Sequence, residues 1–335
     1  MSARPGTRLF AGLDEAGLGP LLGPLTLGFS VFRAPSGATD LWRTLHGVVS
    51  DSPADDPRAF VVADSKRVFT RNERGAARLE ATALGFLALL DARRKPPASA
   101  AEVAWRTPRE LGPEERTLAE HPWYADLDAP LPLHVDGGAL ELRVERLARA
   151  MRAAGVELVD AGVRVLPEGE LNRSFERTNN KSLSHWECSS AVLRRLWERH
   201  AREGLHLVID RHGGRFHYGS LLARLFPEAS VERVAEAPSL AEYRLTGRGV
   251  DDGRSMHVFF AEKAESRSFA TALGSCLAKY ARETCMRAFN AYFERLAPAV
   301  APTAGYTQDG RRWLAEVAPH LERAGHGPDQ LVRTR

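Results

Sequence analysis

The sequence predicts an α/β fold in which a single domain occupies residues 1–335. Apolar runs with the length of buried strands alternate along the chain with longer segments whose apolar residues recur at helical spacing. The chain is 44% hydrophobic and 27% charged, which excludes disordered, collagen-like and coiled-coil structure and is typical of a globular protein with a substantial core. It contains no internal repeat and no low-complexity tract, so we expect no array of repeated units.

Two strands joined by a tight turn are expected at the start of the chain. Residues 8–14 and 25–33 are apolar runs of strand length, and the Gly- and Pro-rich residues 17–24 separate them. Such a short connection favours antiparallel pairing. Beyond the next loop, residues 72–93 carry apolar side chains at helical spacing and are expected to form a helix.

The middle of the chain alternates between irregular and regular segments. Residues 95–138 contain seven prolines and are expected to be a loop-rich insertion. A helix is expected at 140–153, a strand at 156–166 and a second helix at 189–202. Residues 205–210 form an apolar run that ends in a carboxylate, which is the pattern of a buried parallel strand.

A second insertion, at about residues 216–258, is expected beyond this strand. Two β-rich runs, 230–237 and 255–262, flank a Gly- and Asp-rich segment that fits a hairpin or a long loop. The apolar stripe from Ser268 to Leu296 predicts the longest helix of the chain. This helix begins a helical part that covers about residues 268–335.

The charge balance and the cysteines limit the class of protein. Lysine and arginine total 46 against 43 acidic residues, and a net charge of +3 is too small to indicate a nucleic-acid-binding protein. Three cysteines without CxxC spacing argue against a disulfide framework or a zinc site, and favour a reducing compartment. The N-terminal region has no signal-peptide pattern, and its longest uncharged stretch is too rich in Gly and Pro for a membrane span. We expect a cytoplasmic protein that does not associate with membranes.

Acidic residues occur at the ends of two expected strands. Asp14 and Glu15 follow the first apolar run and precede Gly17 and Gly19. Because side chains alternate along a strand, both acids can serve one site only if the chain turns there, which the glycines permit. Asp210 ends the second buried strand, and ligands of α/β sheets collect at the carboxyl ends of strands.

Glu265, just before the longest helix, is a fourth candidate for the same site. Converging carboxylates repel one another unless cations hold them, and oxygen ligands select Mg²⁺ or Mn²⁺ over zinc. Two-metal hydrolysis of a phosphodiester fits such a site and needs no histidine, so we assign no role to the eleven histidines. The alternative, for Asp14 or Asp210 taken singly, is a turn or capping residue.

Six collinear segments resemble the type 2 ribonuclease H family. Residues 12–25, GLDEAGLGPLLGPL, resemble the opening pattern GxDEAGRGPxxGP of that family. The other segments, which together span nearly the whole chain, are VADSKRVFTRNER at 62–74, PEGELNRSF at 167–175, LVIDRHGGR at 207–215, KAESRSFATALGSCLAKYARE at 263–283 and GYTQDGRRWL at 305–314.

The resemblance implies a ribonuclease H fold, with a mixed five-stranded sheet flanked by helices and a two-metal site for Mg²⁺ or Mn²⁺. It implies an endonuclease that cleaves on the 5′ side of ribonucleotides in RNA–DNA hybrids or ribonucleotide-containing duplexes, leaving a 3′-hydroxyl and a 5′-phosphate. Asp14, Glu15, Asp210 and Glu265 fall on the four catalytic and metal-binding positions. The family also implies a monomer.

The resemblance further implies a set of substrate-binding residues, which comprises Gly17, Leu18, Gly19, Ser65, Lys66 and Tyr306. In the family, the backbone of the glycine loop binds the ribose 2′-hydroxyl and the tyrosine stacks on a sugar. Leu18 stands where the family has arginine, so a guanidinium that faces a phosphate is lost. For Ser65 and Lys66 a phosphate contact and a structural tie both remain open, and for Tyr306 a packed side chain is the alternative.

Glu265 departs from the family, which has aspartate at this position. Its additional methylene moves the carboxylate, and Mg²⁺ tolerates little displacement. Glu262 is the nearest substitute, and a surface acid in a salt bridge is the alternative for Glu265. Two further functions therefore stay open: a nuclease for structured DNA, which Leu18 suggests, and a catalytically weakened nucleic-acid-binding relative. Residues 121–133, within the first insertion, are acidic and apolar and favour a protein partner over phosphate.

Overall fold

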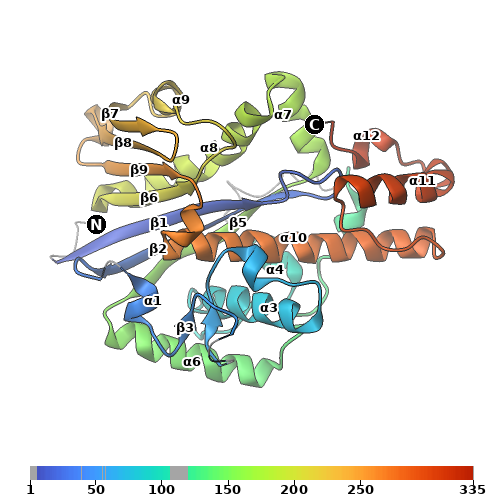
Figure 1. Ribbon diagram of the computed structural model, residues 1–335, viewed down its shortest axis with the longest axis horizontal. Coiled ribbons are helices and arrows are strands. Elements are labelled where there is room, and N and C mark those ends of the chain that lie inside the picture. Colours follow the sequence, from blue (N-terminus) through green and yellow to red (C-terminus); the bar gives the residue numbers. More distant parts are fainter. Residues whose placement is uncertain (1–5, 39, 55, 57, 106–119, 335) are drawn as a thin grey trace.

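The computed structural model describes residues 6–334, apart from residues 39, 55, 57 and 106–119. Its main feature is a mixed sheet of seven strands in the order β5-β2-β1-β6-β9-β8-β7 (Figure 1). The strands are β1 (Thr7–Ala16), β2 (Leu25–Pro35), β5 (Glu157–Leu166), β6 (Leu205–Asp210), β7 (Ala229–Ala237), β8 (Leu240–Gly247) and β9 (Ser255–Ala261). The predicted α/β class, with a mixed sheet flanked by helices, is confirmed.

The pairing of the strands places β1 inside the sheet, between β2 and β6, and makes β6 the central strand. β1 runs antiparallel to β2 and parallel to β6, and β6 runs parallel to β9. β5 pairs antiparallel with the outer side of β2. Parallel neighbouring strands end at the same edge of the sheet. The last residues of β1 and β6 therefore lie close together at that edge.

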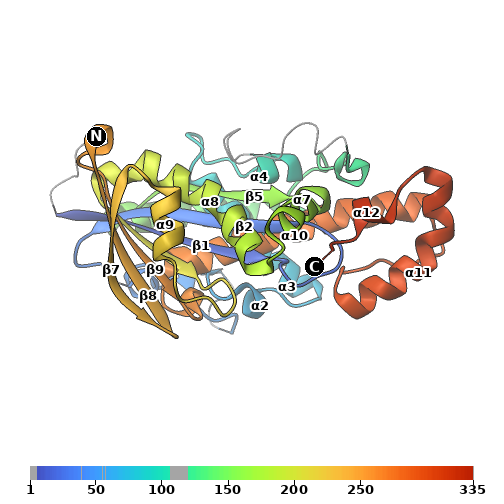
Figure 2. The same cartoon turned by 90° about the horizontal axis from the view of Figure 1, so that it is seen from above.

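The expectation of five strands is wrong, because β7 and β8 extend the sheet at one end (Figure 2). β8 was not predicted from the sequence. It pairs antiparallel with both β7 and β9, and its buried residues Ala241, Tyr243 and Leu245 alternate with polar side chains. The polar positions interrupt the apolar run, so the segment has the weak pattern of a strand with only one buried face.

Helices cover both faces of the sheet (Figure 1). One face carries α10 (Phe269–Leu296), with α3 (Glu73–Ala88) and α6 (Gly137–Ala153) outside it. The other face carries α7 (Glu168–Thr178), α8 (Lys181–His200) and α9 (Gly219–Leu225). The shorter elements are α1 (Leu41–Thr44), β3 (Val49–Ser50), β4 (Phe60–Val61), α2 (Ser65–Val68), α4 (Ala100–Trp105), η1 (Pro122–Tyr124), η2 (Ala201–Glu203), η3 (Gly249–Asp251), η4 (Ala264–Ser266), α11 (Thr307–Ala324) and α12 (Pro328–Leu331).

Helix α8 begins eight residues earlier than the sequence analysis expected. The side chain of Asn180 caps it by accepting a hydrogen bond of 3.0 Å from the amide of Leu183. Its first two turns include Ser184 and His185, which are buried although they are polar. The apolar periodicity used to predict the helix therefore misses these turns.

The first expected insertion is only partly described, because residues 106–119 lie outside the described residues. In the described part, Trp123 is fully buried and its ring lies 6.0 Å from that of Phe289 and 5.7 Å from that of Phe293, both in α10. Leu127 is also buried. These apolar side chains, which suggested a protein partner, are covered within the chain itself. In the described part of the chain, no helix combines the length and apolar character needed to cross a bilayer.

The backbone of helix α10 packs directly against the backbone of β1 and β2, because the residues at the contact are glycines. A Cβ atom on Gly28 of β2 would lie 2.1 Å from the carbonyl oxygen of Gly274, and one on Gly12 of β1 would lie 2.0 Å from the amide nitrogen of Thr271. Neither neighbour is a flexible side chain that can move aside. The glycines therefore set how close α10 lies to the sheet.

Replacing Gly28 by alanine should force α10 away from the sheet. We expect Gly28→Ala to lower the free energy of unfolding, measured by urea denaturation, by about 3 kcal/mol or more, because the clash is with backbone. Gly37→Ala is the matched control, since a Cβ there meets no atom within 4 Å, and it should change the free energy by less than about 0.5 kcal/mol. Equal effects of the two substitutions would contradict this account.

Candidate active site

Three carboxylates converge where β1 and β6 end. One oxygen atom from each of Asp14, Glu15 and Asp210 lies within 4.8 Å of the other two. The parallel pairing of β1 with β6 runs up to Leu13 and Ile209, the residues directly before Asp14 and Asp210. The register of two adjacent strands thus brings together acids that are almost two hundred positions apart in the sequence.

Asp14 and Glu15 both lie within β1, and the chain turns directly after it. Glu15 pairs with Leu27 and Ala16 with Thr26, so the turn begins at Gly17, one of the two glycines expected to permit it. The acids themselves stay extended, because β2 continues to pair with β1 beyond them. Ser275 of α10 lies near Asp14 and lowers its pKa, whereas Glu15 lies against α8 on the opposite face. Both side chains lie at the edge of the sheet where β6 ends in Asp210.

Neighbouring cations compensate the charges of this site only in part, since Lys66 and Arg211 lower the pKa of Asp210 but burial still raises it. In the part of the chain that the structure describes, Asp14 and Asp210 form no ion pair. Burial, reinforced by Asp210, raises the pKa of Asp14 to about 7. Burial and the nearby Asp14 raise the pKa of Glu15 well above its ordinary value, and burial also raises that of Asp210. Two backbone amides donate to the site, from Glu15 to Asp14 at 2.7 Å and from Ala264 to Asp210 at 3.1 Å.

A histidine pair that the sequence analysis did not single out lies behind Glu15. The Nε2 atom of His185 is 3.5 Å from a carboxylate oxygen of Glu15, and the rings of His185 and His212 are 4.1 Å apart. Burial lowers the pKa of His185 to about 3, so this imidazole is neutral and does not compensate the acid. No pattern in the sequence marked these residues, because each lies within an ordinary buried segment.

The donor set of the site fits a divalent cation. Three carboxylates supply hard oxygen ligands, and the raised pKa values of Asp14 and Glu15 show that the surrounding protein does not stabilise their ionised forms. Such a site favours Mg²⁺ or Mn²⁺, which bind carboxylate oxygens. The carboxylates of Asp14, Glu15 and Asp210 are the residues that would hold the ion.

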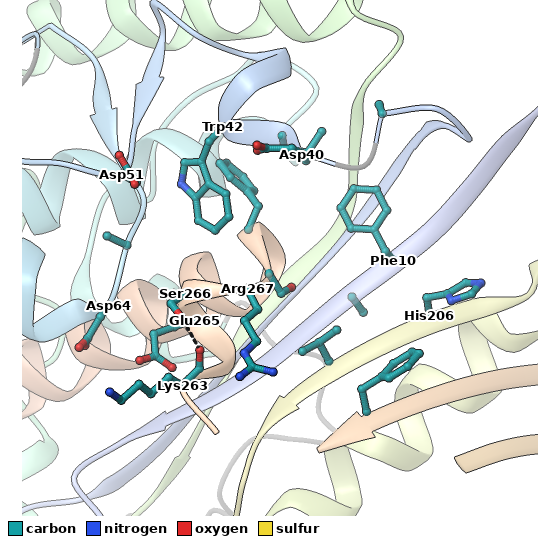
Figure 3. A pocket seen from close by; sticks show the side chains of 18 of the residues that line it. Phe10, Asp40, Trp42, Asp51, Asp64, His206, Lys263, Glu265, Ser266 and Arg267 are labelled. Carbon is teal, nitrogen blue, oxygen red and sulfur yellow. Dashed lines mark hydrogen bonds between the residues drawn. The ribbon is translucent and has the colours of Figure 1, made fainter. Parts of the chain in front are cut away.

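Glu265 lies beside this cluster but is not part of it. It belongs to the short 3-10 turn η4, and its carboxylate raises the pKa of Asp14. Burial, followed by the charges of Asp210 and Asp64, raises its own pKa, whereas Lys66 lowers it. Figure 3 shows Glu265 on the wall of an adjacent pocket. Glu262, the possible substitute, instead forms an ion pair of 2.5 Å with Arg211.

Ser65 and Lys66 occupy different positions around the site. Ser65 is buried and its hydroxyl accepts a hydrogen bond of 3.1 Å from Ser275, the residue that also lies near Asp14. Ser65 therefore links α2 to α10 through a hydrogen bond. Lys66 is exposed, and its ammonium group lowers the pKa values of both Asp210 and Glu265. Lys66 forms no ion pair with any described residue and lies beside the carboxylate site.

The turn after β1 is held from inside the protein by Arg333. Its guanidinium is buried and donates to the carbonyl oxygens of Gly17, Pro20 and Gly23, with the Pro20 bond at 3.3 Å. In a trans peptide the N–H of a residue points away from the preceding carbonyl. The amide of Leu18 is therefore directed away from Arg333, and Gly19 is exposed.

The sequence analysis missed Arg333, which lies 316 residues from Gly17 in the chain. Asn172, in the segment 167–175, holds the same stretch by donating to the carbonyl of Val332 at 2.8 Å and accepting from the amide of Thr334 at 2.9 Å. Burial lowers the pKa of Arg333 to about 10, which leaves it charged at neutral pH. Asn172 thus fixes the residues on either side of Arg333, and Arg333 in turn binds the carbonyl groups of the glycine turn, residues 17–24.

Tyr306 lies next to the same turn. The carbonyl of Gly305 accepts hydrogen bonds from the amides of Leu21 at 2.7 Å and Leu22 at 3.1 Å. The tyrosine is 45% exposed, and the guanidinium groups of Arg71 and Arg282 each lie 5.7 Å from the centre of its ring. The structure thus brings Tyr306 to the glycine turn as an exposed aromatic side chain flanked by arginines.

No protein-family model matches the sequence, and no curated protein is significantly similar to it. Among solved structures, the chain is similar to the ribonuclease H2 of Pyrococcus horikoshii OT3, with a TM-score of 0.45 and 14% identity over 98% of this chain and 93% of the other. It is also similar to RNase HII of Archaeoglobus fulgidus, solved in a complex with PCNA (TM-score 0.40, 15% identity, 98% and 94% covered). A third similar structure is Bst-RNase HIII in complex with Mn²⁺ (TM-score 0.40, 15% identity, 98% and 66% covered).

Removing the charge of Asp14 should stabilise the metal-free protein at high pH. Because the pKa of Asp14 rises from 3.8 to about 7 on folding, its contribution to stability is complete below pH 4 and is lost as the pH rises through 7. Calorimetry in EDTA at pH 8 should give Asp14→Asn a Tm higher than that of the parent by ~2 °C or more. At pH 5 the difference should shrink, and millimolar Mn²⁺ should raise the Tm of the parent only. Equal Tm values of parent and variant at both pH values would contradict the assignment.

Replacing Arg333 by methionine should free the glycine turn. We expect Arg333→Met to lower the free energy of unfolding by about 3 kcal/mol, since it leaves buried carbonyls without their charged donor, and to accelerate hydrogen exchange at residues 17–23. Arg295→Met is the control, because Arg295 makes an exposed ion pair with Asp126 that contributes at most about 1 kcal/mol. Unchanged exchange in the turn of Arg333→Met would show that Arg333 does not hold it.

Proposed function

We propose that this protein is a metal-dependent endoribonuclease of the type 2 ribonuclease H family, acting on ribonucleotides within RNA–DNA hybrids or DNA duplexes. The observation that carries the proposal is the convergence of Asp14, Glu15 and Asp210 at the shared end of β1 and β6, with no cation of the described chain paired to Asp14 or Asp210. The glycine turn, residues 17–24, is hydrogen-bonded to Gly305, the residue before Tyr306, and this proximity supports the same function.

The carboxylates would share the binding of cations in the proposed reaction. Asp14, Glu15 and Asp210 would hold Mg²⁺ or Mn²⁺, which when bound would supply an acidified water and charge stabilisation for in-line displacement at phosphorus. Glu265, beside the cluster, would contribute a ligand to a second cation. Hydrolysis then leaves a 3′-hydroxyl and a 5′-phosphate.

The glycine turn recognises the ribose in this proposal. The amide of Leu18, directed away from Arg333, offers a donor to the 2′-hydroxyl, and Tyr306 stacks on the neighbouring sugar. A backbone donor does not depend on the side chain of residue 18. The amide can therefore bind the ribose 2′-hydroxyl although this residue is leucine. The missing guanidinium weakens phosphate binding by about 1.5–3 kcal/mol, which Lys66 beside the carboxylate site offsets in part.

A second candidate function is a nucleic-acid-binding relative with weakened catalysis. The observation that favours it is the position of Glu265, which lies outside the three-carboxylate cluster of the described residues. One strong cation site with a poor second site would bind substrate and cleave it slowly. The variant Glu265→Asp distinguishes this candidate from the first.

The decisive experiment is a cleavage assay on a duplex with a single ribonucleotide, in Mg²⁺ or in Mn²⁺. We expect a cut on the 5′ side of the ribonucleotide, no cut in an all-DNA duplex, and a loss of about 10³-fold or more in rate for Asp14→Asn. Asp252→Asn is the control, because Asp252 is exposed in a distant hairpin. Its rate should equal that of the parent.

Two outcomes would argue against the proposal, and a third measurement tests the role of Glu265. The absence of cleavage of any ribonucleotide-containing substrate, including a long RNA–DNA hybrid, would overturn it. Cleavage of the all-DNA duplex would indicate a nuclease for structured DNA. If Glu265→Asp cleaves faster than the parent, residue 265 has a role in metal binding. If the rate is unchanged, another residue must bind the second cation.

A further inference from the structure

A pocket of about 960 Å³ lies beside the carboxylate site, over a part of the sheet that α10 leaves uncovered. Its floor is formed by Phe10 of β1, His206 and Val208 of β6, and Phe259 of β9. Its walls come from α1, α2 and η4, so the pocket opens next to Glu265 (Figure 3). None of the proposed metal ligands except Glu265 lines it.

The floor of this pocket presents rings on three adjacent strands. Phe10 pairs with His206 in the register of β1 and β6, and His206 pairs with His257 in the register of β6 and β9. The rings of His206 and His257 lie 5.5 Å apart, and those of His257 and Phe259 lie 4.3 Å apart. Residues in register on adjacent strands point to the same face, so these rings form one row.

The rings of this row are partly accessible from the pocket and are not enclosed in the hydrophobic core. Phe10, His206 and Phe259 are only half-buried, whereas their neighbours on the other face, such as Leu207 and Val258, are fully buried. Burial and the neighbouring charges of His257 and Arg8 lower the pKa of His206. Its ring is therefore neutral at physiological pH and available for stacking.

Cations without ion-pair partners surround the rings. Five basic side chains line the pocket, and none of them forms an ion pair with a residue that the structure describes: Arg8, Lys66, Arg67, Lys263 and Arg267. Of the four acidic side chains there, Asp40 and Asp64 accept hydrogen bonds from the amides of their own helices, and Glu265 faces the metal ligands. The remaining acid, Asp51, is exposed. Five cations thus face four acids in the pocket, and two of the acids are already engaged by backbone amides.

Accessible rings together with free cations are the chemistry that recognises an unpaired strand of nucleic acid. Bases stack on aromatic side chains while basic side chains follow the phosphates. A duplex keeps the faces of its bases inside its own stack, so it cannot use such a floor. Lys66 and Glu265 belong both to this pocket and to the surroundings of the carboxylates, so a strand in the pocket would continue directly into the active site.

We propose that this pocket binds a single-stranded segment of nucleic acid that flanks the cleaved duplex, with bases on Phe10, His206 and Phe259 and phosphates on Arg8 and Arg267. The substrate class is therefore a ribonucleotide-containing duplex with a single-stranded extension. This inference rests on the proposed function for its substrate. Binding of the strand does not itself require cleavage.

The test is the affinity of the full chain for a fluorescent twelve-nucleotide oligothymidylate, measured by anisotropy in EDTA so that no cleavage occurs. Phe259→Ala should raise the Kd about tenfold, because one stacking platform is lost. Phe216→Ala is the matched control, since its half-buried ring lies outside the pocket, and it should leave the Kd unchanged. Thermal unfolding of both variants checks that they are folded.

A second pair of variants tests the charges without touching any packed ring. Arg267→Ala should weaken binding and lower the slope of log Kd against log salt by about one. Arg224→Ala, an exposed arginine of α9 on the opposite face of the sheet, should change neither quantity. Equal effects of Phe259→Ala and Phe216→Ala, or of Arg267→Ala and Arg224→Ala, would overturn the inference. Displacement of the oligothymidylate by oligoglutamate at equal concentration would also overturn it, in favour of an acidic protein.

Cleavage assays separate this inference from the proposed function. Phe259→Ala should slow the cleavage of a duplex with a single-stranded extension about tenfold relative to a blunt duplex. Equal slowing of both substrates would overturn the inference. If the parent cleaves neither substrate but the two ring variants still differ in oligothymidylate binding, the proposed function fails and the strand-binding pocket stands.

Discussion

The close contact between α10 and the central strands is the constraint on which the site depends. Gly12, Gly28 and Gly274 allow the backbone of the helix to touch that of the strands. At this distance Ser275 reaches both Asp14 and Ser65, and the η4 turn that precedes α10 donates a backbone amide to Asp210. The same contact sets where α10 begins, and therefore how much of the sheet face stays open beside Glu265.

Among the described residues, Asp14 has no ion-pair partner and lies close to two other carboxylates. Asp160 of β5 is a useful comparison, because it pairs with Arg195 at 3.0 Å and with His200 at 3.1 Å. Asp14 and Glu15 are crowded by another carboxylate and face a neutral histidine. Crowded carboxylates with raised pKa values are typical of functional sites, and this cluster offers the ligands that a divalent cation prefers.

The surfaces around the carboxylates are held by residues from distant parts of the chain. Arg333 supports the glycine turn from within, Gly305 binds the same turn from the side, and the η4 turn borders the open sheet face. None of these groups touches a reacting atom in the proposed mechanism. They determine instead which backbone amides and which rings are presented to a substrate, so substrate choice depends on tertiary contacts more than on the acids.

The sequence by itself determined the elements and the acids. Apolar periodicity is a local signal, so it located β1, β2, β5, β6, β9 and α10, and a strand that ends in a carboxylate identified Asp14 and Asp210. Tertiary structure decided what depends on long-range contacts: the β8 strand, the extended backbone at Glu15, the position of Glu265 beside the cluster, the histidine behind Glu15 and the link from Arg333 to Gly17. These features follow from strand register and from packing between residues as much as 316 positions apart, and a local pattern contains no information about such distances.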